Sequence, residues 1–154
     1  MGTQQLLLIV LGVIIVGVAI AVGITIFNNQ AYNANQQAVA QELTTYGTMV
    51  LQWWKTPEVQ GGKGKKALVA GDDVKIRKWC GFPVATTALE TESGKYAITA
   101  VTVADTTVTI IGVGDEKKTG PLYPRVTATV KLPTSKITSV IGTNDTDSPI
   151  AATP

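Results

Sequence analysis

The sequence predicts an α+β fold, in which one long N-terminal helix packs on a small antiparallel β-sheet head. Three observations lead to this prediction: an uncharged apolar N-terminal run, apolar residues at helical spacing in the polar stretch after it, and β-branched segments separated by turn residues. Hydrophobic periodicity is the main sequence signal that separates helices from strands. We therefore divide the chain into an apolar helix segment (1–27), an amphipathic continuation of that helix (28–56) and a β-rich globular head (57–154).

The apolar run extends from Leu6 to Phe27 and contains no charged side chain. As a helix it would be about 33 Å long, which is enough to cross the hydrocarbon core of a bilayer. No Lys or Arg precedes it, it is longer than the apolar region of a secretory signal, and an Ala-x-Ala pattern occurs only well beyond its end, at 38–40. We therefore expect a membrane-inserted helix, not a cleaved signal. Because the head is far larger than the five residues before the span, we expect the head outside the membrane.

The helix is predicted to continue through the polar stretch as far as residue 55. Pro57 supplies the stop, and Gly47 is a weak point of about 1 kcal/mol where a slight bend is expected. Spacings of 4, 3, 4 and 3 residues mark an apolar stripe on one helix face, made of Val39, Leu43, Tyr46, Val50 and Trp53. This stripe needs a packing partner, and within the chain the head is the candidate.

The first part of the head is expected to be a loop followed by a short helix. The basic cluster Lys63, Lys65 and Lys66 lies among glycines and is expected to be a solvated loop. Asp72 is expected to cap a helix that ends near residue 80, with Trp79 packing inward.

Four strands are predicted after this helix, at 95–104, 106–113, 123–132 and 136–141. The first changes phase in the middle, which indicates a bulge. Turn residues separate the strands, so an antiparallel meander is the simplest arrangement. One face would cover the helix stripe, and the threonine-rich face would point outward.

Composition excludes several classes of function. The chain has no histidine, which removes the commonest general base and most zinc and haem sites. The single cysteine, Cys80, permits no intramolecular disulfide and is expected as a small buried hydrophobe, with a reactive thiol as the alternative. A net charge of +2 is too weak to indicate nucleic acid binding. We expect no enzyme activity, cofactor, metal or small-molecule substrate. Asn144 begins a match to the N-glycosylation acceptor motif.

A uniformly apolar segment near the N-terminus that continues as an amphipathic helix into a β-rich head resembles the type IV pilins and pseudopilins. The resemblance covers residues 1–55 in kind and the head only in class. It implies that the apolar halves lie in the inner membrane before assembly and then pack together as a filament core, with the heads outside. The implied partners are further copies of the same chain and the pilus assembly machinery.

Two positions depart from the usual pattern of that family. Pilins usually have an aromatic residue at the first mature position and a glutamate at the fifth, where this chain has Met1 and Gln5. Gln5 can accept a hydrogen bond from a neighbour, but it supplies no charge. No leader ending in glycine precedes Met1, so a leader is either already absent or never existed. By resemblance, we expect the assembly interface at Met1, Gln5, Leu6, Leu7, Ile9, Leu11, Ile14, Val18, Ala19 and Gly23.

Gly12, Gly17 and Gly23 are spread along the apolar segment, and two interpretations of them remain open. Small residues let membrane helices approach closely. Glycine also weakens a helix, so the segment could melt locally on assembly.

The expected function is that of a structural subunit polymerising through its apolar helix into a type IV pilus-like extracellular filament. One alternative is a minor pseudopilin of a secretion or DNA-uptake machine. Another is a non-polymerising, single-pass, membrane-anchored binding protein. The sequence does not distinguish adhesion, motility, uptake and secretion as the role of the filament.

Overall fold

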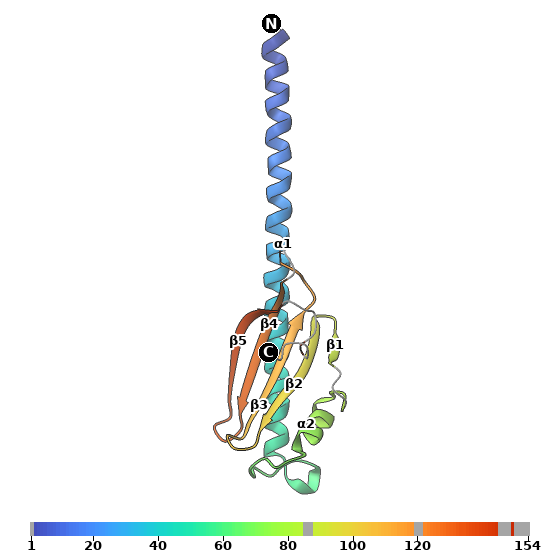
Figure 1. The fold of residues 1–154 in the computed structure, drawn as a ribbon, viewed down its shortest axis with the longest axis vertical. Coiled ribbons are helices and arrows are strands. Elements are labelled where there is room, and N and C mark those ends of the chain that lie inside the picture. Colours follow the sequence, from blue (N-terminus) through green and yellow to red (C-terminus); the bar gives the residue numbers. More distant parts are fainter. Residues whose placement is uncertain (1, 85–87, 119–121, 145–148, 150–154) are drawn as a thin grey trace.

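The computed structural model describes residues 2–84, 88–118, 122–144 and 149. A single uninterrupted helix, α1 (Gly2–Lys55), carries the head on its C-terminal half, while its N-terminal half projects freely (Figure 1). The predicted α+β arrangement is confirmed. The helix continues through Gly47, and that glycine packs against the sheet.

Five strands form one antiparallel sheet in the order β1-β2-β3-β4-β5, so each strand pairs with its neighbours in sequence (Figure 1). Their bounds are β1 (Leu89–Thr91), β2 (Gly94–Thr102), β3 (Thr107–Gly114), β4 (Tyr123–Lys131) and β5 (Lys136–Asn144). The prediction of four strands is therefore wrong by one. The missed strand, β1, has three residues, which is too short to show the alternation by which strands are recognised.

The predicted bulge in β2 is confirmed by a register shift between Ile98 and Ala100. Ile98 pairs with Ile110 and Val101 pairs with Val108. The extra residue thus keeps both Ile98 and Val101 on the same face of the sheet, the face that contributes to the core.

The core lies between α1 and one face of the sheet. On β4 and just beyond it, the predicted inward residues are all buried: Val126, Ala128, Val130 and Leu132. The opposite face is less open to water than expected. Thr127 and Thr129 are half-buried there, and Ile111 and Val113 of the central strand β3 are buried. Val113 lies opposite Lys95 and Arg125, whose long aliphatic stems flank it.

Two glycines allow the helix and the sheet to approach closely. A Cβ atom at Gly112 would lie 2.7 Å from the ring of Tyr96 and 2.9 Å from Val39. A Cβ atom at Gly47 would lie 3.0 Å from Ile137. Side chains at these two positions would push the stripe of α1 away from the strands.

A one-turn 3₁₀ helix, η1 (Glu58–Gln60), and the helix α2 (Asp72–Cys80) complete the head. Two details of α2 correct the prediction. Gly71 is the residue before the helix and Asp72 is its first residue, so Asp72 is not the cap. Ile76 and Cys80 pack inward, whereas Trp79 is 39% exposed. The buried face follows a four-residue spacing from Asp72, which leaves Trp79 outside it.

Candidate functional site

The most unusual surface of the molecule is the N-terminal half of α1. Its large apolar side chains from Leu6 to Phe27 are between 48% and 69% exposed. Among the described residues, α1 is the one helix that is long and apolar enough, by length and composition, to cross a membrane. Soluble proteins rarely expose apolar surface of this extent, so the segment needs lipid or protein around it.

The residues expected at the assembly interface lie on this exposed segment, apart from Met1, which is outside the described residues. They are distributed around the whole circumference of the helix, and none contacts the head: Gln5, Leu6, Leu7, Ile9, Leu11, Ile14, Val18, Ala19 and Gly23. A Cβ atom built at Gly12, Gly17 or Gly23 meets nothing within 4 Å. Within one chain, these glycines therefore have no packing role.

The expected helix–head stripe lies in the core. Val39, Leu43, Val50 and Trp53 are buried, and Tyr46 is half-buried. The ring of Tyr46 lies at 5.0 Å from that of Phe82 and at 5.4 Å from that of Tyr96, in edge and tilted geometries. Burial, and secondly the nearby Glu42 carboxylate, raise the pKa of Tyr46.

The loop after α1 closes the C-terminal end of the helix. The backbone amides of Lys63 and Lys65 donate to the carbonyls of Trp53 and Trp54, at 3.1 and 2.8 Å. The two indoles donate in return to loop carbonyls, Trp53 to Gly61 at 3.2 Å and Trp54 to Lys66 at 3.0 Å. Helix ends leave unpaired carbonyls, and this loop satisfies two of them.

The basic cluster is only partly the solvated loop that was expected. Lys63 is buried, and its ammonium lies 2.6 Å from the Asp72 carboxylate, whose side chain is fully buried. Lys66 does follow the expectation, because it forms an exposed ion pair with Glu58 at 2.9 Å. The loop folds back under the end of α1, which brings Lys63 to the start of α2.

Two residues nearer the apolar N-terminal segment also join the helix to the head, and sequence analysis did not identify them. Tyr32 is 5% exposed, and burial raises its pKa. The side-chain amide of Asn35 donates to the carbonyl of Ser93, at 2.8 Å, in the β1–β2 turn. Tyr32 precedes Val39 by seven residues, two helical turns, so its place on the same face was a usable signal.

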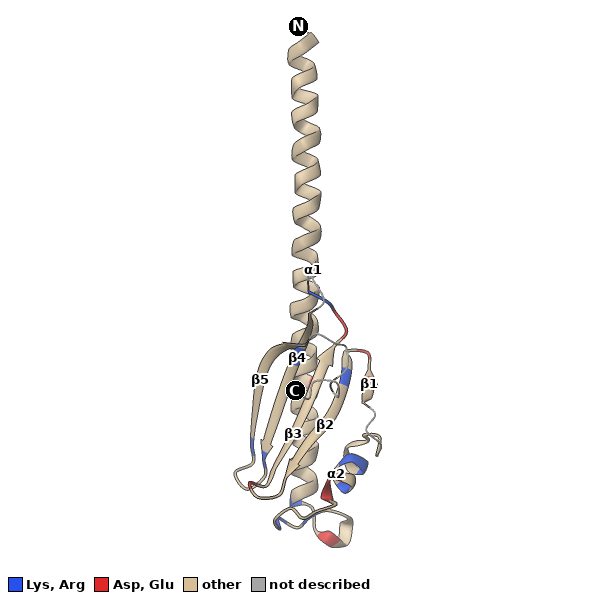
Figure 2. Cartoon of the chain, in the orientation of Figure 1, with Lys and Arg blue, Asp and Glu red and all other residues tan. Residues whose placement is uncertain are grey.

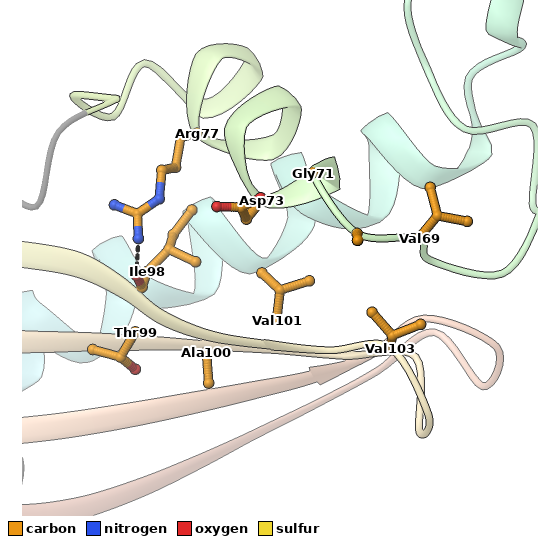
Figure 3. Close-up of a pocket in the computed structure, with 10 residues that line it drawn as sticks. Val69, Gly71, Asp73, Arg77, Ile98, Thr99, Ala100, Val101 and Val103 are labelled. Atoms are coloured by element: carbon orange, nitrogen blue, oxygen red, sulfur yellow. Dashed lines mark hydrogen bonds between the residues drawn. The ribbon is translucent and has the colours of Figure 1, made fainter.

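A cleft of about 370 Å³ lies between α2 and β2 (Figure 3). Its lining is mostly aliphatic and includes one carboxylate, Asp73, and one guanidinium, Arg77. Arg77 donates to the carbonyl of Ile98, at 2.6 Å, beside the bulge (Figure 3). The guanidinium thus satisfies a backbone group at the edge of β2, which is a structural role.

The described residues contain no group of three or more His, Cys, Asp or Glu that could hold a metal ion. Cys80 is a free, buried thiol, as expected, and burial raises its pKa to about 12. Asn144 is the last residue of β5, but the rest of its acceptor motif lies outside the described residues.

Comparison with protein-family models, curated proteins and solved structures finds no match to this chain. The resemblance to type IV pilins therefore rests on the pattern of residues 1–55 and, for the head, only on its β-rich class.

Proposed function

We propose that this chain is a structural subunit that polymerises through the N-terminal half of α1 into a type IV pilus-like extracellular filament. The observation that carries the proposal is the uncharged apolar segment, 6–27, which projects from a packed head and is exposed on every side. The proposal includes no catalytic step, cofactor or nucleic acid.

The segment has two environments that suit it, lipid and a bundle of identical helices. Before assembly, each subunit would lie in the inner membrane, with the head outside. The pilus assembly machinery would then transfer the segment from lipid into the filament core. Since lipid is as apolar as the helices, close packing favours the bundle, and small residues such as Gly12, Gly17 and Ala19 permit it.

The head contributes rigidity at the base of the apolar segment. Buried residues of α1 from Tyr32 to Trp53, which include the stripe, fix the second half of the helix on the sheet over about 30 Å of helix axis. Consequently, a head cannot tilt independently of its own helix, and bundling of the helices sets the positions of the heads.

The test is electron microscopy of material sheared from the producing cells, with mass spectrometry of its main band. Filaments built from this chain, with residues 6–27 in their core, are the expected result. Filaments in which those residues lie outside the core would overturn the proposal. A chain present at trace level in such material indicates a minor pseudopilin. A chain confined to the membrane fraction indicates an anchored, non-polymerising protein.

A further inference from the structure

The loop between β3 and β4 brings two lysines to the end of the head that faces the apolar segment. Lys117 and Lys118 are exposed. The ammonium of Lys118 lies 5.9 Å from the centre of the Tyr32 ring, and that of Lys117 lies 5.1 Å from the centre of the Tyr123 ring. The contact with Tyr32 places the charge of Lys118 beside α1, just beyond its apolar half, and the contact with Tyr123 places that of Lys117 at the start of β4.

The position of Lys118 along the axis of α1 matches that of the headgroup layer of a bilayer. Tyr32 follows Phe27, the last residue of the apolar run, by five positions, or about 8 Å of helix axis. The headgroup layer on each side of the hydrocarbon core is about 5–8 Å thick. With residues 6–27 in the core, Lys118 therefore lies at headgroup depth.

The charged residues of the head that lie nearest to the apolar segment belong to the β3–β4 loop (Figure 2). The first 41 residues of the chain carry no side-chain charge. Asp115 and Glu116 belong to the same loop, but Figure 2 shows the basic pair nearer to the N-terminal half of α1 than the acidic pair. Two other lysines of the sheet, Lys131 and Lys136, lie together at its opposite end (Figure 2).

We propose that Lys117 and Lys118 bind the phosphates of anionic phospholipid headgroups while the chain is inserted in the membrane before assembly. This inference rests on the membrane insertion in the proposed function. Lysines near an anionic surface are attracted to it, by about fivefold in affinity for each residue. The contact would hold the head against the bilayer until the segment is transferred into the filament.

The experiment uses the full chain at one copy per lipid nanodisc, in phosphatidylcholine alone or mixed with phosphatidylglycerol. Amide hydrogen exchange is measured across the β3–β4 loop. We expect exchange at 116–118 to be several-fold slower in the anionic discs, and the difference to vanish at high salt. The double variant Lys117→Gln/Lys118→Gln should lose the difference, whereas the control Lys131→Gln/Lys136→Gln should keep it.

Equal exchange in both lipids, or an unchanged difference in the Lys117/Lys118 variant, would overturn the proposal. Protection that depends on protein concentration and not on lipid would assign the lysines to a second copy of the chain and also overturn it. Failure of the chain to co-elute with the discs is a separate result, because it contradicts membrane insertion itself. Unchanged fluorescence of the buried Trp53 shows that each variant is folded.

Discussion

The ammonium group of Lys63 lies 2.6 Å from the carboxylate of Asp72, and both side chains are buried. Asp72 also accepts a hydrogen bond from the backbone amide of Val69, at 2.9 Å, and lies 3.5 Å from the ammonium of Lys75. The pair therefore connects the loop that closes α1 with the first residue of α2. It holds in place a segment, 58–71, that contains only one short 3₁₀ helix.

Breaking this pair should destabilise the head. Asp72→Asn leaves the Lys63 ammonium buried beside a neutral amide, and removal of one member of a buried ion pair typically costs about 3–5 kcal/mol. The free energy of unfolding is measured by urea titration of the full chain in detergent, with Trp53 and Trp54 fluorescence as the signal.

Two controls make this prediction specific. In the double variant Lys63→Met/Asp72→Asn, no buried charge remains unpaired, and the ammonium of Lys75 stays in water, so most of the loss should be recovered. Lys66→Gln breaks the exposed pair with Glu58 and should change the free energy of unfolding by less than about 1 kcal/mol. Equal effects of Asp72→Asn and Lys66→Gln would contradict a buried pair.

The same carboxylate should make the stability of the head depend on pH. Desolvation alone would raise the pKa of Asp72, but the hydrogen bonds from Lys63 and Val69 outweigh it and hold that pKa below its usual value. The carboxylate therefore stabilises the fold above the unfolded-state pKa, near 4, and the contribution is lost as pH falls through the lower folded-state value. The urea midpoint of unfolding should decrease as the pH falls below about 4, and this decrease should be less steep in Asp72→Asn. Identical pH profiles would argue against this linkage.

Gly112 should be intolerant of any side chain. The Cβ atom of Gly112→Ala would lie 2.7 Å from Tyr96 and 2.9 Å from Val39, both fully buried. Overpacking of this kind costs about 1–3 kcal/mol. Gly142→Ala is the matched control, because it lies in the neighbouring part of the same sheet with nothing within 4 Å of the added atom. Its midpoint should stay at or slightly above that of the wild type, and a similar loss in both variants would rule out the close approach of helix and sheet.

Cys80 should be inert in the folded protein. Its pKa of about 12 leaves a thiolate fraction of about 10⁻⁴ at about pH 8, and burial blocks access to the sulfur. We expect a maleimide reagent to label Cys80 only after urea unfolds the head. Rapid labelling of the folded chain would instead support the reactive-thiol alternative.

The long helix and the face of β4 could be predicted because each depends on a regular local pattern. The four- and three-residue spacing of the stripe and the strict alternation after Tyr123 are visible in the sequence alone. The ion pair of Lys63 was not predictable in this way, since it forms only when the loop folds back under the end of α1. A run of lysines among glycines has the same local appearance whether or not one of them is buried.

The candidate site also has one part that the sequence predicts and one part that only the fold reveals. The apolar segment is predictable because absence of charge over 6–27 is a local property. The position of Lys117 and Lys118 at the base of that segment depends on the meander topology, which returns the β3–β4 loop to the level of Tyr32. No spacing in the sequence connects residues 32 and 118, and only the pairing of the strands brings them together.

The glycines of the apolar segment provide the sharpest test of polymerisation. Replacing Gly12, Gly17 and Gly23 with leucine adds side chains where a single chain has empty space, and it raises helix propensity by up to about 1 kcal/mol at each position. The head should therefore unfold at the same urea concentration as in the wild type, and membrane insertion should persist. If these positions pack against neighbouring helices, the added bulk should strongly reduce the yield of sheared filaments.

The control replaces Val13, Val16 and Val22 with leucine, which enlarges the same segment without filling a glycine position. Normal filament yield from the glycine variant would exclude close packing at these glycines, and normal function without any filaments would favour the anchored-protein alternative.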